Sequence, residues 1–137
     1  TIRLALNCAA MGMLVFATLH TNNATKTVER IIDAVPADEQ NQIRIMLAES
    51  LRGIVSQLLC QKKDGGRIAV HEILLTHGAL PNCIRTHSLS NIRNIIDQNR
   101  DQGMISMDAS LVKLLEADLI TKEEAYMKAI DKTRFKV

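Results

Sequence analysis

The sequence predicts an α/β protein whose strands lie in the first part of the chain and whose last part is entirely helical. Three patterns lead to this fold class: apolar residues at helical spacing near the start, a short continuous apolar run at residues 14–19, and two strand patterns on either side of a glycine-containing turn at residues 62–66. After Gly78 the pattern is helical to the end. We therefore divide the 137 residues into an α/β part, 1–78, and a helical part, 79–137.

The first elements are predicted to be a helix, a strand and a second helix. Helical spacing covers residues 2–9. The run LVFATL at residues 14–19 is too short for a typical helix, so it predicts a strand buried on both faces, as in a parallel sheet. The polar turn at residues 20–23 offers N-cap residues for a helix over residues 28–35, which Pro36 stops.

A third helix and a β-hairpin follow. Asp38 is placed to cap a helix whose buried side carries Ile43, Leu47 and Leu51. Residues 54–60 and 67–75 are predicted to be strands, and the turn between them makes a hairpin. In the helical part, Thr121 and Glu124 have the spacing of a capping box.

Composition excludes several classes of protein. Hydrophobic residues make up 47% and charged residues 23% of the chain, as in ordinary globular proteins. A net charge of +2 and an aromatic content of only 2% argue against a nucleic-acid partner. No apolar run reaches the roughly 18–20 residues that a membrane span needs. We therefore expect neither nucleic-acid binding nor a direct membrane span.

The three cysteines predict neither a metal site nor a disulfide framework. Cys8, Cys60 and Cys83 are widely spaced, odd in number and free of any CxxC pair. Reduced thiols in a cytoplasmic protein are the simpler interpretation.

His20 is the first candidate site residue, because it directly follows the predicted strand at residues 14–19. In open α/β sheets, ligands collect at the carboxyl ends of the strands, where a histidine can hydrogen-bond a phosphate or a reacting water. Two alternatives stay open: a solvent-facing loop histidine, and a structural histidine that caps the next helix.

His71 and Glu72, two adjacent polar residues, lie in the predicted hairpin. Side chains alternate along a strand, so His71 and Glu72 are expected on opposite faces and do not form a metal or acid–base pair. We expect Glu72 to make a salt bridge at the edge of the sheet.

These segments, taken in order, carry a resemblance to a known family. LVFATLHT at residues 14–21 is similar to the histidine box of the type II/IV secretion ATPases, and ATKTVERIIDAVP at 24–36 resembles the AKTxxRxxDxxP stretch that follows it. TIRLAL at 1–6 resembles the segment after the Walker B region, and GGRIAVHEIL at 65–74 the late hairpin. The pilus-retraction, or twitching-motility, branch is the most similar.

The resemblance implies the C-terminal part of a RecA-like P-loop ATPase domain followed by an all-helical subdomain. It implies ATP and Mg²⁺ as cofactors of the intact protein, a homo-hexamer, and coupling of ATP hydrolysis to pilus retraction. The implied partners are the inner-membrane pilus platform and the pilin machinery, and the implied location is the cytoplasm, peripheral to the inner membrane. By the same resemblance His20 is the catalytic residue, and Thr18 and Thr21 are nucleotide-binding residues.

Residues 79–86 resemble an output motif of the retraction branch. Ala79, Asn82, Ile84 and Arg85 match it, whereas Pro81 stands where a basic residue is expected and Thr86 where an acidic one is. The alternative is that Leu80 and Ile84 pack a helix onto the domain while Arg85 is solvated.

The sequence also departs from the family pattern. Met13 stands where the box usually begins with His, and Ala10 where an acidic residue is usual. The chain has no GxxxxGK[ST] phosphate loop and no Walker B strand, so we expect a portion of a longer protein that does not hydrolyse ATP alone. Two alternatives stay open: part of a type II secretion or pilus-extension ATPase, and a non-catalytic interaction domain of ATPase-derived fold.

Overall fold

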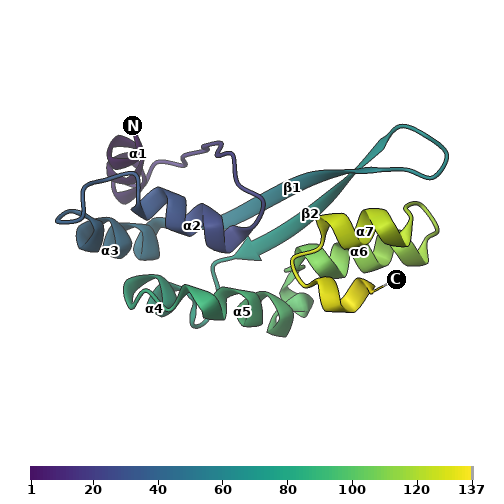
Figure 1. Ribbon diagram of the computed structural model, residues 1–137. Helices are drawn as coiled ribbons and strands as arrows, with labels where there is room; N and C mark the ends of the chain where they lie inside the picture. Colours follow the sequence, from purple (N-terminus) through teal and green to yellow (C-terminus); the bar gives the residue numbers. More distant parts are fainter. Residues whose placement is uncertain (137) are drawn as a thin grey trace.

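A long β-hairpin connects the two ends of the molecule (Figure 1). The structure is a computed structural model and describes residues 1–136. Strand β1 (Gly53–Gln61) and strand β2 (Arg67–Leu75) pair antiparallel along their whole length. The N-terminal helices lie near one end of this hairpin, and the last helices lie beside its other half.

Three helices precede the hairpin: α1 (Ile2–Ala10), α2 (Ala24–Ile32) and α3 (Gln40–Ser50). Asn23 caps α2, because its side-chain oxygen accepts the backbone N–H of Lys26 at 2.8 Å. Helix α2 ends at Ile32, so the predicted extension to residue 35 and the stop at Pro36 are wrong. The N-cap position of α3 is held by Glu39 rather than the predicted Asp38.

The hairpin is confirmed with its predicted strands. The register runs from Gly53 opposite Leu75 to Gln61 opposite Arg67. Gly65 and Gly66 at the tip have φ angles of +89° and +76°, which glycine adopts without strain. The two glycines of the predicted turn therefore allow the backbone conformation that joins β1 to β2.

The predicted buried strand at residues 14–19 is wrong. These residues form no strand, and Leu14 and Phe16 are 76% and 88% exposed. A strand needs a neighbour that takes up its backbone N–H and C=O groups. Within the described residues, β1 and β2 are the only strands and pair with each other, so the apolar run has no ladder to join.

The part after Gly78 is helical, as predicted. Its α-helices are α4 (Leu80–Arg85), α5 (Ile92–Gln98), α6 (Met107–Glu116) and α7 (Lys122–Lys128), with short 3-10 helices at Leu89–Asn91, Arg100–Gln102 and Lys132–Phe135. The predicted capping box is half right. The hydroxyl of Thr121 accepts the N–H of Glu124 at 3.1 Å, but the Glu124 carboxylate accepts the N–H of Gln61 on β1 at 3.0 Å.

Two apolar cores share the hairpin. The first joins buried residues from Leu6 to Met104, including helices α1 to α5 and one end of the strands. The second joins the other end of the strands to α6, α7 and Phe135. Burial raises the pKa of the Cys60 thiol in this second core, so the thiol stays neutral. The division of the chain at residue 78 stays a prediction.

The buried hydroxyl of Ser56 on β1 provides a test of this packing. Ser56 is 4% exposed, and its Oγ has no hydrogen-bond partner among the described residues. Leaving such a group unpaired costs about 1–3 kcal/mol. We expect Ser56→Ala to keep the free energy of unfolding unchanged or to raise it by up to about 1 kcal/mol, measured by urea denaturation.

Ser106→Ala is the matched control. Ser106 is 3% exposed, but its hydroxyl donates to Asp97 Oδ1 at 3.0 Å. Its removal is expected to lower the free energy of unfolding by about 1 kcal/mol. An equal loss in both variants would contradict the description of Ser56 as unpaired.

Candidate functional site

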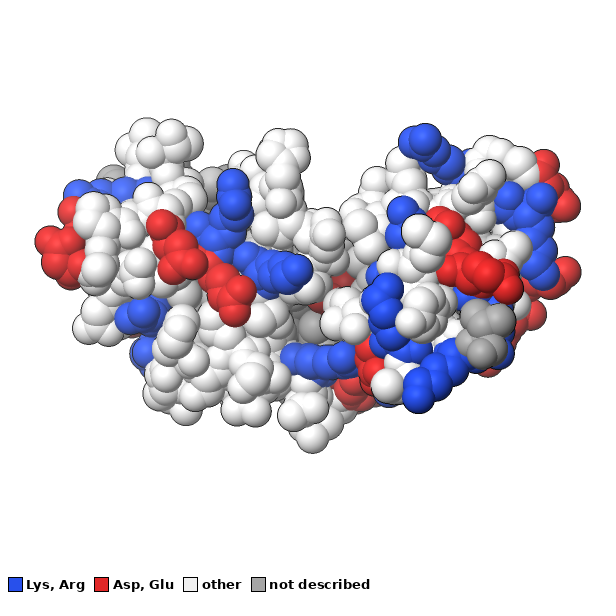
Figure 2. All heavy atoms as spheres, in the orientation of Figure 1, with Lys and Arg blue, Asp and Glu red and all other residues white. Residues whose placement is uncertain are grey.

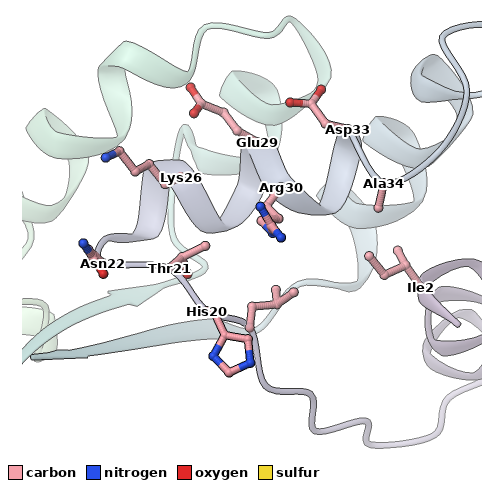
Figure 3. A pocket seen from close by; sticks show the side chains of 10 residues that line it. Ile2, His20, Thr21, Asn22, Lys26, Glu29, Arg30, Asp33 and Ala34 are labelled. Atoms are coloured by element: carbon pink, nitrogen blue, oxygen red, sulfur yellow. The ribbon is translucent and has the colours of Figure 1, made fainter.

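A hollow of about 670 Å³ lies where the polar turn meets α2. Its lining comes from the start of α1, from the turn and from one side of α2, namely Ile2, Leu19, His20, Thr21, Asn22, Lys26, Glu29, Arg30, Asp33 and Ala34 (Figure 3). The structure therefore brings the predicted residues His20 and Thr21 together in one concave surface. The third predicted residue, Thr18, is exposed and lies outside this lining.

His20 is exposed at the mouth of the hollow. In Figure 3 its ring and the Arg30 guanidinium lie on the same side of α2, while Glu29 and Asp33 point to the opposite side. His20 lies four residues before the first residue of α2, so the position of the helix start limits where the ring can be. An exposed imidazole and a guanidinium that line one hollow are both able to contact an anionic ligand.

A short hydrogen-bond chain holds the turn against α2. Thr27 Oγ1 donates to the carbonyl oxygen of Asn23 at 2.8 Å, and the hydroxyls of Thr21 and Thr27 are 2.6 Å apart. Since the single Thr27 proton goes to Asn23, Thr21 must be the donor in the second bond. Thr21 Oγ1 therefore retains only acceptor capacity, and its hydroxyl orients the turn in this geometry.

Charged residues alternate along the exposed side of α2. Lys26, Glu29 and Arg30 lie on α2 and Asp33 is its C-cap residue, and Figure 2 shows positive and negative side chains next to one another over this helix. The sequence analysis missed Lys26 and Arg30 as lining residues. Their spacing of four, immediately after a polar turn, was the available signal.

The described part of the chain holds no group of three His, Cys, Asp or Glu side chains arranged to bind a metal ion. Positive groups at the hollow, Lys26 and Arg30 together with His20, fit the chemistry of phosphate oxygens. The hollow thus offers one wall suited to an anion and no carboxylate cluster suited to a divalent cation.

The residues of the predicted output motif lie on and before α4, away from the hollow. Ala79 is the N-cap residue, Ile84 is 1% exposed in the first core, and Asn82 and Arg85 are exposed. Pro81 lies in the first turn of α4, where a missing N–H costs no helical hydrogen bond. Ile84 is therefore a packing residue, while Asn82 and Arg85 are the accessible members of the motif.

Glu72 differs from the prediction. It makes no salt bridge within residues 1–136; it is 4% exposed and accepts two backbone N–H groups, from Ala24 at 2.7 Å and from Met107 at 3.0 Å. The predicted opposite orientation of His71 is confirmed, since His71 Nε2 lies 2.9 Å from Gln57 Oε1 on the other face of the hairpin. The predicted edge salt bridge is wrong because the two helix starts supply the donors.

Comparison with known proteins shows the family and the fold of the chain. Residues 1–126 match the model of the family described as type II/IV secretion system protein. The chain is 43% identical over 129 residues to the type IV pilus retractation ATPase PilT of Pseudomonas aeruginosa and 45% identical over 130 residues to the twitching motility protein of Neisseria gonorrhoeae. Each match covers 94% of this chain, but only 38% and 35% of the relatives.

A solved structure gives the same result. The crystal structure of the pilus retraction motor PilT with bound ADP superposes with a TM-score of 0.85 at 38% identity, over 97% of this chain and 37% of that one. The chain thus spans little more than a third of the length of these proteins and has the fold of the corresponding part of a P-loop ATPase. This chain belongs to the type II/IV secretion system protein family.

Proposed function

We propose that the chain is the C-terminal portion of a hexameric motor ATPase that couples ATP hydrolysis to retraction of a type IV pilus. The observation that carries this proposal is the hollow at the start of α2, where His20, in the segment similar to the histidine box, and Arg30 line the same side. The similarity to retraction ATPases over 94% of the chain supports the same function.

In this proposal His20 contacts the terminal phosphate of ATP and promotes its hydrolysis. An imidazole ring has two nitrogens that can take part in hydrogen bonds, which suits contact with a phosphate oxygen or an attacking water. Arg30 adds a fixed positive charge on the same side of α2. Thr18 and Thr21 belong to the nucleotide-binding surface, with Thr21 orienting the turn through its bond to Thr27.

The chain supplies only part of a nucleotide site. ATP contributes the phosphoanhydride bond that is broken, and the His20 side of the hollow fits its anionic end. The sequence lacks the phosphate loop, and its described residues offer no cluster of carboxylates for Mg²⁺. We propose that the cradle and the metal ligands belong to other parts of a longer protein and that this portion alone does not hydrolyse ATP.

The remaining features of the proposal follow from the same family. The intact protein forms a homo-hexamer in the cytoplasm, peripheral to the inner membrane, and acts on the pilus platform and the pilin machinery. No helix among the described residues is both long and apolar enough to cross a membrane. Residues 79–86 transmit motion, with Asn82 and Arg85 as the accessible contacts.

Replacement of His20 tests the catalytic assignment. We expect His20→Ala in the longer protein to lower the ATP hydrolysis rate by about 10²-fold or more, because a positioned acid–base or hydrogen-bonding group is lost. His20 is exposed, so the melting temperature should change little. His77→Ala is the matched control, since His77 is also exposed and lies outside the lining of the hollow. An unchanged rate in the His20 variant rules out the assignment.

Replacement of Arg85 tests the output role. Arg85→Ala should abolish or strongly reduce pilus retraction while hydrolysis and hexamer formation remain, because Arg85 is exposed on α4 and away from the hollow. Retraction, ATPase rate and oligomeric state are scored together. Arg100→Ala, an exposed arginine in the same helical part, is the control. Retraction that survives, or that falls only in step with hydrolysis, leaves residues 79–86 without a separate mechanical role.

A further inference from the structure

The Glu72 side chain lies between the starts of two helices that are distant in sequence. Oε1 accepts the N–H of Ala24, the first residue of α2, and Oε2 accepts the N–H of Met107, the first residue of α6. The two carboxylate oxygens therefore accept hydrogen bonds from two different helices. With 4% exposure, the carboxylate has little access to water that would replace either donor.

The Glu72 carboxylate accepts hydrogen bonds from the two helix starts and not from the side-chain hydroxyl that lies opposite it in the hairpin. Ser56 lies directly opposite Glu72 in the hairpin register, yet the Ser56 hydroxyl has no hydrogen-bond partner. The N–H groups of a helix start carry partial positive charge, which makes them the stronger partners for an acidic side chain. Glu72 therefore bonds to α2 and α6 rather than to the polar side chain that lies opposite it in the hairpin.

Oε1 of Glu72 binds the backbone next to the candidate site. The backbone N–H that it accepts belongs to Ala24, which directly follows the turn containing His20 and Thr21. The turn is also held to α2 by the bond between Thr21 and Thr27. If the start of α2 shifts away from β2, the His20 ring shifts with it.

Oε2 of Glu72 binds the start of α6, in the helical part of the chain. Helix α6 belongs to the second core through Met107 and Leu111, and the residue two positions before it, Ile105, pairs with Ile73 on β2. The hydroxyl of Ser110 on the same helix also donates to the carbonyl oxygen of His71, next to Glu72. Helix α6 is therefore held to β2 at the residue that also holds α2.

We infer that Glu72 is a positioning residue that fixes the His20 turn and the start of α6 relative to each other. It acts through the backbone of α2 and touches neither the hollow nor a reacting group. The inference rests on the proposed function for its effect on hydrolysis, whereas its structural part depends only on the two hydrogen bonds. A change at either helix start is then transmitted to the other through one side chain.

Glu72→Gln in the longer protein tests the inference. Glutamine keeps one acceptor oxygen and places an NH₂ donor against the second backbone N–H, so one bond is lost. We expect amide hydrogen exchange at Ala24 or Met107 to become at least about tenfold faster. We also expect kcat for ATP hydrolysis to fall about tenfold to a hundredfold through misplacement of His20, with KM changed by less than about twofold. Glu72→Asp, which keeps the charge but shortens the reach, should speed exchange at one of the same two amides.

Asp108→Asn is the matched control. Asp108 is 1% exposed and also accepts two backbone N–H groups, from Ile130 at 2.8 Å and Asp131 at 3.0 Å, but these hold the C-terminal segment and not α2. Its variant should lose stability while kcat and exchange at Ala24 stay close to those of the parent. If Glu72→Gln does not fold, the exchange and the kcat of Glu72→Asp decide the outcome.

The outcomes separate the two claims. Unchanged exchange at both amides in the Glu72 variants overturns the positioning role. Equal losses of kcat in the Glu72 and Asp108 variants do the same, because they would reflect general destabilisation. A parent protein that does not hydrolyse ATP overturns the proposed function and the effect of Glu72 on hydrolysis. In that case, amide hydrogen exchange at Ala24 and Met107 alone tests whether Glu72 positions the two helix starts.

Discussion

The fold depends on one buried carboxylate that two helix starts share. A buried acidic group is costly unless it is paired, and Glu72 finds its partners in the N–H groups of Ala24 and Met107. Such N-terminal contacts stabilise a carboxylate by about 0.3–1 kcal/mol each at exposed sites and by up to about 2 kcal/mol when partly buried. Without this link, the start of α2 would lose its hydrogen bond to β2, and α6 would keep only the bonds that Ser110 and Ile105 make there.

A second buried carboxylate does the same for the end of the chain. Asp108 on α6 accepts the Arg93 guanidinium at 2.6 Å together with the N–H groups of Ile130 and Asp131. The hydroxyl and the backbone N–H of Thr133 lower the pKa of the neighbouring Asp131 carboxyl and favour its charged form. Glu72 and Asp108 thus link α2, β2, α6 and the last residues in series, and they join the two apolar cores by directional bonds.

The candidate site was predicted in part. His20 was identified from its place after a predicted strand that the structure lacks and from the family resemblance, and Thr21 from that resemblance; both line the hollow. Lys26 and Arg30 were missed because, on a helix surface, charged residues at this spacing resemble an ordinary solvated face. Thr18 lies outside the hollow, since it is exposed in a run without regular secondary structure, and no strand sets the direction of its side chain.

The sequence by itself determined the hairpin, the positions of most helices and the family, because turn glycines, helical spacing and motif order are local features of the chain. It did not determine the state of residues 14–19, because burial of a strand depends on neighbours that the pattern does not specify. It also did not reveal the role of Glu72. Only the tertiary structure decided that role, because the donors are 48 and 35 residues away in sequence and meet the carboxylate only when α2 and α6 pack on β2.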